Sequence, residues 1–189
     1  MKDTTGLRKL TESALCVAAA VALSTITLFR MPLGGSVTPF ATLPIIVISL
    51  RHNAKWGVSA ALVFSLTQCM LGVSSIQAVP VRSGLYVMLC ILLDYVLAYT
   101  AIGFTGTLSR VLGGKRPGLS AAVGLTGLAR LACSFISGVL VWASFTPEGW
   151  NVAVYSLAYN ALWCLPDVGI ALFACLALTR VKTLGLTRP

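Results

Sequence analysis

Six runs of apolar residues separated by short polar segments dominate this sequence. They cover about residues 10–29, 37–50, 56–71, 85–108, 119–145 and 151–179. Only 10% of the residues are charged, against about 25% in soluble domains. A membrane helix needs about 20 apolar residues, and lipid leaves no partner for open backbone groups, so we expect six helices, the second and third partly interfacial. The sequence predicts an all-α polytopic membrane protein, with residues 1–189 as one integral membrane domain.

The basic residues between these runs fall mostly on one side of the predicted membrane. That side carries eleven: Lys2, Arg8, Lys9, Arg51, Lys55, Arg110, Lys115, Arg116, Arg180, Lys182 and Arg188. The other side carries Arg30 and Arg82. Lys and Arg accumulate on the cytoplasmic side, so we expect both termini in the cytoplasm and the turn between the last two helices outside, in the plasma membrane. No basic stripe accompanies the net charge of +9, so nucleic-acid binding is not expected.

Three ionisable residues, Asp94, Arg130 and Asp167, lie near the middle of predicted helices. An unpaired charge there costs about 2.5–3.5 kcal/mol on insertion scales. If all three are ionised, the interior holds one uncompensated negative charge, which a cationic ligand would neutralise. Alternatively, Arg130 pairs with one acid for structural reasons, and burial keeps the other protonated.

Polar side chains follow one face of each of the last two helices. The fifth carries Arg130, Ser134 and Ser137, and the sixth Ser156, Asn160, Trp163 and Asp167, all at helical spacing. Such faces meet either a cavity or each other through interhelical hydrogen bonds. Because Trp142 and Tyr155 flank the turn that joins these helices, we favour a ligand pocket that opens outward.

Other motifs restrict the class of protein. The six cysteines are dispersed and His52 is the single histidine, so we expect no metal site and no cofactor. The sequence contains no G-x-x-x-x-G-K-[ST], H-E-x-x-H or G-x-S-x-G motif, which argues against ATP hydrolysis and against an enzyme. A proton-coupled carrier that uses Asp94 or Asp167 remains an alternative, although no internal repeat is evident. Ala14 and Ala18 form a small-xxx-small pair that favours close approach of another helix, from this chain or a partner.

Four segments carry a resemblance to a known family: LTESALCVAAAVAL, MPLGGSVTPFATLPIIVISLR, LLDYVLAYTAIGFTG and SGVLVWASFTPEGWNVAVYSLAYN. They resemble the thiamine-specific substrate-binding subunits (S components) of energy-coupling factor (ECF) transporters, the ThiT/YuaJ family. The resemblance implies a six-helix S-component fold with an outward pocket under the loop between helices three and four. It also implies thiamine capture, with the first helix docking through Ala14 and Ala18 onto a coupling subunit that carries two ATP-binding subunits.

The resemblance also implies roles for seven residues. Asp94 hydrogen-bonds the aminopyrimidine, Tyr95 is the neighbouring aromatic, Trp142 stacks, Tyr155 and Asn160 make polar contacts, Arg130 is a basic position, and Ser134 replaces a stacking histidine. The segment Thr38–Thr42 also lacks the acid that some relatives have, and Val73–Gln77 lacks a histidine. The chain therefore lacks several of the family's contacts to the thiazolium. Thiamine and a smaller aminopyrimidine precursor both remain candidate ligands.

Overall fold

A computed structural model of the chain describes residues 4–32, 34–80 and 83–181. Its elements are α1 (Thr4–Ser24), β1 (Phe29–Arg30), β2 (Ser36–Val37), α2 (Leu43–Arg51), α3 (Ala54–Leu71), α4 (Val73–Gln77), α5 (Gly84–Cys90), η1 (Ile91–Leu97), α6 (Ala98–Thr100), η2 (Ala101–Phe104), α7 (Thr105–Val111), α8 (Arg116–Leu140), η3 (Ala143–Phe145) and α9 (Val152–Leu178). The stretch from α5 to α7 is one continuous helix, Gly84–Val111. The all-α class is confirmed, and the expected count of six is roughly met by α1, α2, α3, Gly84–Val111, α8 and α9.

Three helices in the described part of the chain are long and apolar enough to cross a membrane: Gly84–Val111, α8 and α9. The other three differ in length or polarity. Helix α1 has 21 residues but carries Arg8, Lys9 and Glu12 in its first half. Helix α2 has nine residues, so it is only about 14 Å long, less than half of a bilayer core of about 30 Å.

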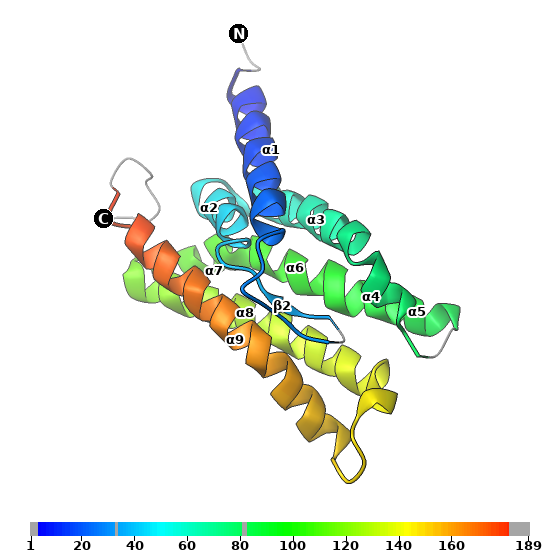
Figure 1. The fold of residues 1–189 in the computed structure, drawn as a ribbon. Coiled ribbons are helices and arrows are strands. Elements are labelled where there is room, and N and C mark those ends of the chain that lie inside the picture. Colours follow the sequence, from blue (N-terminus) through cyan, green and yellow to red (C-terminus); the bar gives the residue numbers. More distant parts are fainter. Residues whose placement is uncertain (1–3, 33, 81–82, 182–189) are drawn as a thin grey trace.

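Helices α8 and α9 pack along each other for most of their length, as the yellow and orange ribbons of Figure 1 show. The helix Gly84–Val111 packs against α8 and against α3, and α1 packs on α2 and α3. A buried cluster that includes Ile45, Phe64 and Leu119 joins α2, α3 and α8. Gly57 and Gly103 let α3 and η2 approach closely, because a Cβ on Gly103 would lie 2.7 Å from the Gly57 carbonyl oxygen.

The second apolar run does not begin as a helix, contrary to our expectation of a helix from residue 37. Val37 lies in β2, which pairs antiparallel with β1, and α2 begins only at Leu43. Phe40 has a φ of 66°, a left-handed conformation that no right-handed helix can include. The turn of the hairpin needs Gly35, with a φ of 74°, because a Cβ there would lie 2.6 Å from the Trp163 indole nitrogen. The hairpin therefore rests directly on α9.

Other boundaries also differ from the apolar runs, and helix α1 begins at Thr4 rather than residue 10. Helix α1 ends at Ser24 rather than residue 29, where the Ser24 and Thr25 hydroxyls donate to the carbonyls of Val21 and Ala22 and so satisfy groups that a helix end leaves open. Helix α8 ends at Leu140 rather than residue 145. The polar segment between the third and fourth apolar runs contains α4. Apolar composition marks what lies in lipid and does not show where a helix stops.

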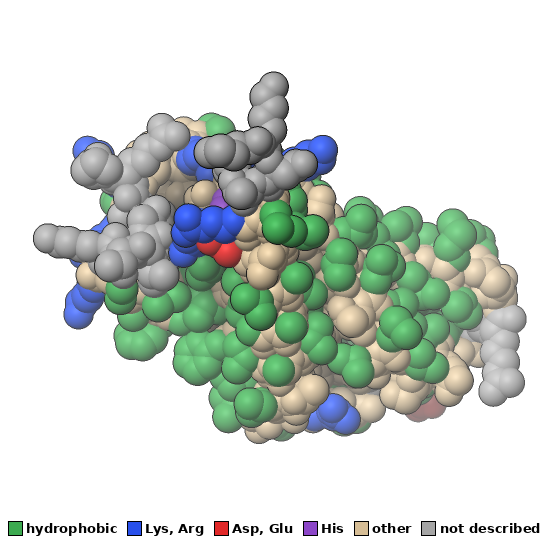
Figure 2. Space-filling model, turned by 90° about the horizontal axis from the view of Figure 1, so that it is seen from above, with side chains coloured by type: hydrophobic (Ala, Val, Ile, Leu, Met, Phe, Trp, Pro, Cys, Tyr) green, Lys and Arg blue, Asp and Glu red, His purple; other side chains and the backbone are tan. Residues whose placement is uncertain are grey.

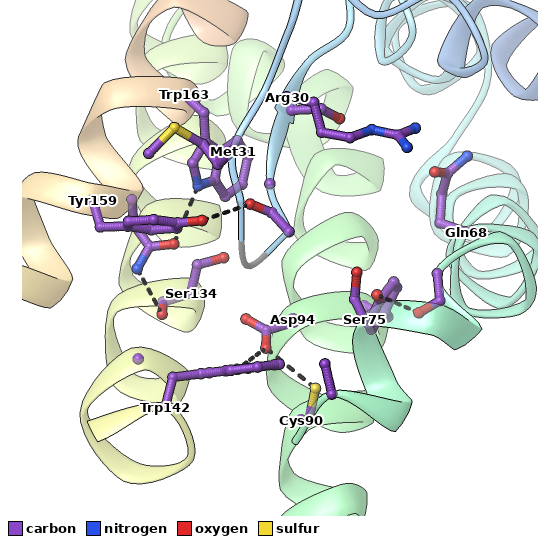
Figure 3. A pocket seen from close by; sticks show the side chains of 18 of the residues that line it. Arg30, Met31, Gln68, Ser75, Cys90, Asp94, Ser134, Trp142, Tyr159 and Trp163 are labelled. Carbon is purple, nitrogen blue, oxygen red and sulfur yellow. Dashed lines mark hydrogen bonds between the residues drawn. The ribbon is translucent and has the colours of Figure 1, made fainter. Parts of the chain in front are cut away.

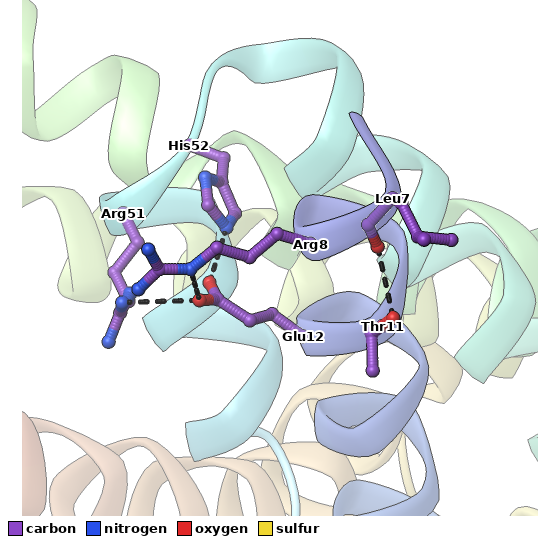
Figure 4. A network of polar contacts seen from close by, with 6 residues as sticks. All are labelled: Leu7, Arg8, Thr11, Glu12, Arg51 and His52. Carbon is purple, nitrogen blue, oxygen red and sulfur yellow. Dashed lines mark hydrogen bonds and ion pairs between the residues drawn. The ribbon is translucent and has the colours of Figure 1, made fainter. Parts of the chain in front are cut away.

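Charged side chains gather at the end of the molecule where α1 begins, and hydrophobic side chains cover much of the rest of the face shown in Figure 2. Glu12 accepts from Arg8 Nε at 3.1 Å, contacts His52 Nε2 at 2.9 Å and pairs with Arg51 at 3.5 Å, as Figure 4 shows. This cluster connects α1 to the end of α2. Four basic residues of the charge count, Lys2, Arg82, Lys182 and Arg188, lie outside the described residues.

Candidate functional site

A cavity of about 620 Å³ lies among α3, α4, the helix Gly84–Val111, α8, α9 and the hairpin. Its volume is within the usual range of about 300–1,000 Å³ for small-molecule sites. Figure 3 shows side chains from these separate elements pointing into one common space. The cavity is therefore built by segments that are far apart in the sequence.

The seven residues implied by the sequence all line this cavity. They are Asp94, Tyr95, Arg130, Ser134, Trp142, Tyr155 and Asn160. The structure thus brings together positions from three helices and from the turn after α8. Direct contact between each of them and a ligand stays a prediction.

Asp94 and Tyr95 lie in η1, a π-helical segment within the long helix. Cys90, Asp94, Tyr95 and Tyr99 all line the cavity. On a regular α-helix, positions 90 and 99 are about two and a half turns apart and would point in opposite directions. A π-helical turn bonds residue i to i+5 and so adds one residue to the turn, which returns Cys90 and Tyr99 to the same face. The wider turn is what gives this helix four cavity-lining side chains.

The Asp94 carboxylate is held through one of its two oxygens. Oδ2 accepts a short hydrogen bond from Ser137 Oγ at 2.5 Å, and two longer ones from Trp142 Nε1 at 3.4 Å and Cys90 Sγ at 3.5 Å. Oδ1 has no hydrogen-bond partner among the described residues. An ionised carboxylate oxygen that is open to a cavity can accept a charge-assisted hydrogen bond from a ligand N–H.

Arg130 and Asp167 form a buried ion pair across α8 and α9. Arg130 NH1 lies 2.6 Å from Asp167 Oδ2, and the Thr38 backbone N–H donates to Asp167 Oδ1 at 3.3 Å. The Arg130 guanidinium also lies between the rings of Tyr99 and Trp163, 4.7 and 4.8 Å from their centroids. Of the two acids that we considered as partners of Arg130, the structure pairs Asp167. No ion pair joins Arg130 to Asp94 among the described residues.

The polar face of α9 both lines the cavity and bonds to α8. Asn160 Nδ2 donates to the Ser134 carbonyl at 3.2 Å and to the Ser156 carbonyl at 2.9 Å. Asn160 Oδ1 accepts from Trp163 Nε1 at 3.3 Å. Since the amide already has protein partners at both ends, Asn160 holds the wall together whether or not it also contacts a ligand.

Aromatic rings form much of the remaining wall. The rings of Tyr155 and Tyr159, which both line the cavity, have centroids 6.0 Å apart. The ring of Trp150 lies outside the lining and packs edge to face on Tyr155, with centroids 6.3 Å apart. Tyr159 donates its hydroxyl to the Gly34 carbonyl at 3.0 Å, which ties α9 to the hairpin. A wall of this kind suits a flat, partly polar ligand, because aromatic faces stack and also attract cations.

Comparison with known proteins identifies the group to which the chain belongs. The family model described as thiamine transporter protein (Thia_YuaJ) matches residues 10–184. Thiamine transporter ThiT of Bacillus subtilis (strain 168) is 35% identical over 188 residues, which cover 93% of each chain.

The chain belongs to the Thia_YuaJ family of thiamine transporter proteins. Thiamine transporter ThiT of Lacticaseibacillus paracasei is 25% identical over 159 residues, 79% of this chain and 75% of that protein. The solved structure of ThiT from Listeria monocytogenes has the same fold, with a TM-score of 0.75, 22% identity and coverage of 96% of this chain and 98% of that one. A Thia_YuaJ member is a transport protein in the membrane, so the expectations of a membrane protein and of a non-enzyme are both confirmed.

The predicted docking pair of this Thia_YuaJ protein faces away from the bundle. Ala14 and Ala18 are exposed on α1, whereas Cys16, Val17 and Ala20 pack towards the core cluster. The small-xxx-small pair is therefore not used for packing within the described part of this chain. Docking of a partner on it stays a prediction.

Several cavity residues were not singled out as site residues from the sequence. They are chiefly Trp163 and Tyr159 on α9, Tyr99 and Cys90 on the long helix, and Met31 and Arg30 on the hairpin. Trp163 could have been predicted, because it belongs to the polar stripe of the sixth apolar run. The hairpin residues were not, since they lie between runs that periodicity describes only as helices. Among the described residues, no group of three or more His, Cys, Asp or Glu side chains comes together as a metal site would require.

Proposed function

We propose that this chain, as one integral membrane domain, is the thiamine-binding S component of an ECF transporter. One observation carries the proposal: a cavity of about 620 Å³ gathers all seven implied ligand residues, and one oxygen of Asp94 is open to it. The aminopyrimidine amine is a suitable donor for that oxygen. Membership of the Thia_YuaJ family supports thiamine as the ligand, and the two relatives named above are called thiamine transporters.

The local charge around Asp94 also supports a cationic ligand, since Arg30, the other charged residue of the lining that forms no ion pair among the described residues, makes no contact with Asp94. Arg130 has its counter-charge in Asp167, while Asp94 has neutral donors around it. The thiazolium of thiamine would bring a positive charge to a cavity that contains one carboxylate without a cationic partner among the described residues. The free-energy cost of burying the Asp94 carboxylate falls when a positively charged ligand binds beside it.

The ligand test is calorimetry on purified protein in detergent, with thiamine and with the free aminopyrimidine. We expect thiamine to bind more tightly, because the cationic ring adds its own interaction. Equal affinity for the two compounds would favour the precursor as the true ligand.

Thiamine should also quench tryptophan fluorescence, and Trp142→Ala should remove most of that change if Trp142 stacks on the ligand. An unchanged quench would contradict the assignment of Trp142.

The proposed partners are an ECF transmembrane coupling subunit and two ATP-binding subunits. The chain would lie in the plasma membrane with both termini on the cytoplasmic side. The sequence has no phosphate-binding loop of its own, so the energy for transport has to come from other subunits. The exposed Ala14 and Ala18 offer a face that a partner helix can approach closely.

The docking test replaces each alanine by tryptophan. Ala14→Trp and Ala18→Trp should abolish uptake in reconstituted vesicles and leave thiamine affinity unchanged, because binding and coupling use different surfaces. Leu162→Trp, at an exposed position of α9, serves as a matched control for a bulky ring facing lipid. Loss of ligand binding in both alanine variants would instead assign this face to packing within the protein. Uptake without any ATP-binding subunit would favour a self-sufficient carrier.

A further inference from the structure

Ser137 differs from the other buried hydroxyls of the described helices in that its hydroxyl donates to a carboxylate. Ser49, Ser65 and Thr105 are also buried, and each donates to a carbonyl of its own helix three residues earlier. Ser137 is fully buried (0% exposed), and its Oγ donates to Asp94 Oδ2 on another helix. Its rotamer is therefore tied to the carboxylate and not to its own backbone.

The same residue also anchors the turn that carries Trp142. The Ser137 carbonyl accepts from the N–H groups of Val141 and Trp142 at 2.7 and 3.4 Å, and the Trp142 indole N–H in turn reaches Asp94 Oδ2 at 3.4 Å. Ser137, Trp142 and Asp94 thus form a closed set of contacts between the end of α8 and η1. Removing the Ser137 hydroxyl leaves the backbone bonds in place and takes away the shortest contact to the carboxylate.

We propose that Ser137 is a positioning residue, which fixes the Asp94 carboxylate so that Oδ1 alone is presented to the ligand. The inference rests on the proposed function, because it concerns how the aminopyrimidine is recognised. Oδ2 already accepts hydrogen bonds from three protein donors. Its lone pairs are therefore occupied, and a ligand N–H cannot form a strong hydrogen bond to Oδ2 in addition to one to Oδ1. Asp94 then acts as a single acceptor for the exocyclic amine, and not as a bidentate partner for the amine together with a protonated ring nitrogen.

A double-mutant cycle separates this role from simple packing. We would measure thiamine affinity by calorimetry for the wild type, Ser137→Ala, Asp94→Ala and the double variant. Ser137→Ala should weaken binding about three- to tenfold, the range of one hydrogen bond. In the Asp94→Ala background the same change should cost less than about twofold, because the carboxylate to be positioned is gone. Ser65→Ala, which removes another fully buried hydroxyl away from the cavity, should leave affinity unchanged in both backgrounds.

A second measurement uses an analogue of thiamine in which a hydrogen replaces the exocyclic amine. The wild type should prefer thiamine over this analogue, and Ser137→Ala should reduce the preference, which a purely structural serine would not do. Ser137→Cys keeps a weak donor and should fall between the wild type and Ser137→Ala. If Ser137→Ala does not fold, the same cycle is run with Ser137→Cys.

The outcomes distinguish the two proposals. A wild type that does not bind thiamine overturns the proposed function. A wild type that binds thiamine, with equal losses for the Ser137 change in both Asp94 backgrounds or with an unchanged preference for the amine, overturns the positioning role alone. Coupled losses together with a reduced preference for the amine support it.

Discussion

Asp94 and Asp167 are two carboxylates in neighbouring parts of the same helical bundle, and they have opposite surroundings. Asp167 is saturated: Arg130 binds one of its oxygens at 2.6 Å and the Thr38 N–H binds the other at 3.3 Å. Asp94 Oδ2 accepts hydrogen bonds from neutral donors, and Oδ1 remains open to the cavity. The first arrangement suits a carboxylate that holds helices together, and the second suits one that meets a ligand.

The contrast shows how the bundle separates structural from ligand-binding polarity. Helix α8 supplies the partners of both acids along one face, with Arg130 bound to Asp167, Ser137 bound to Asp94, and Ser134 between them. A cation is given to the acid that is 3% exposed, where a lone charge would be most costly. The acid beside the cavity keeps a neutral set of donors, and its charge remains for the ligand.

The largest expected effect is on the saturated acid. Asp167→Asn leaves the Arg130 guanidinium buried without its counter-charge, which typically costs about 3–5 kcal/mol. For a chain of this size the unfolding temperature in detergent should fall by roughly 6–20 °C. Arg130→Met combined with Asp167→Leu should recover much of this loss, since an apolar pair of similar volume removes both charges together. A small shift for Asp167→Asn would show that the pair is not the structural one.

The second effect is on the open acid and should appear in binding. Asp94→Asn replaces a charged acceptor by a neutral one, and a charge-assisted hydrogen bond is worth about 1.5–3 kcal/mol. Thiamine affinity should therefore weaken by about one to two decades, with a much smaller change in unfolding temperature than for Asp167→Asn. If instead stability collapses and the folded fraction binds as before, the contrast between the two acids is wrong.

The sequence predicted the components of this contrast but not their pairing. Asp94, Arg130 and Asp167 could be placed at similar depth from their positions in apolar runs, and the faces of α8 and α9 followed from helical spacing. Which acid meets Arg130 depends on how helices rotate about their axes. The π-helical turn of η1 changes that rotation within one helix, and no apolar pattern reports it. The hairpin that pairs Phe29 with Val37 was missed for a related reason, because these two residues end and begin apolar runs that were assigned as helices.

A third change tests the space between the two acids. Ser134 lies one turn from Arg130 on α8, lines the cavity and is 4% exposed. Ser134→His should tighten thiamine binding if the neutral imidazole stacks on the cationic ring, which typically adds about 0.5–2 kcal/mol. The gain should be absent for the free aminopyrimidine, and Ser134→Ala controls for loss of the hydroxyl. An equal change for both ligands would mean that the histidine acts on the cavity wall and not on the cation.

The smallest effect on stability is expected for Glu12, a third acidic residue to compare with Asp94 and Asp167. Glu12 has three basic neighbours, but it lies at the surface. Its contacts to Arg8, Arg51 and His52 are 3.1, 3.5 and 2.9 Å, and the Arg8 side chain is 76% exposed. Exposed pairs are worth about 0.2–1 kcal/mol each, because water and salt screen them and ordering long side chains costs entropy. Glu12→Gln should therefore lower the unfolding temperature by only about 2–4 °C.

High salt provides the control for this last prediction. The difference between the wild type and Glu12→Gln should shrink in about 1 M salt, where the screening length is about 3 Å. The difference caused by Asp167→Asn should persist, since ions do not reach a pair whose side chains are 4% and 3% exposed. If both differences respond to salt alike, burial does not distinguish the two ion pairs. If neither responds, the cluster at Glu12 is held by the packing of His52, whose side chain is 11% exposed, rather than by charge.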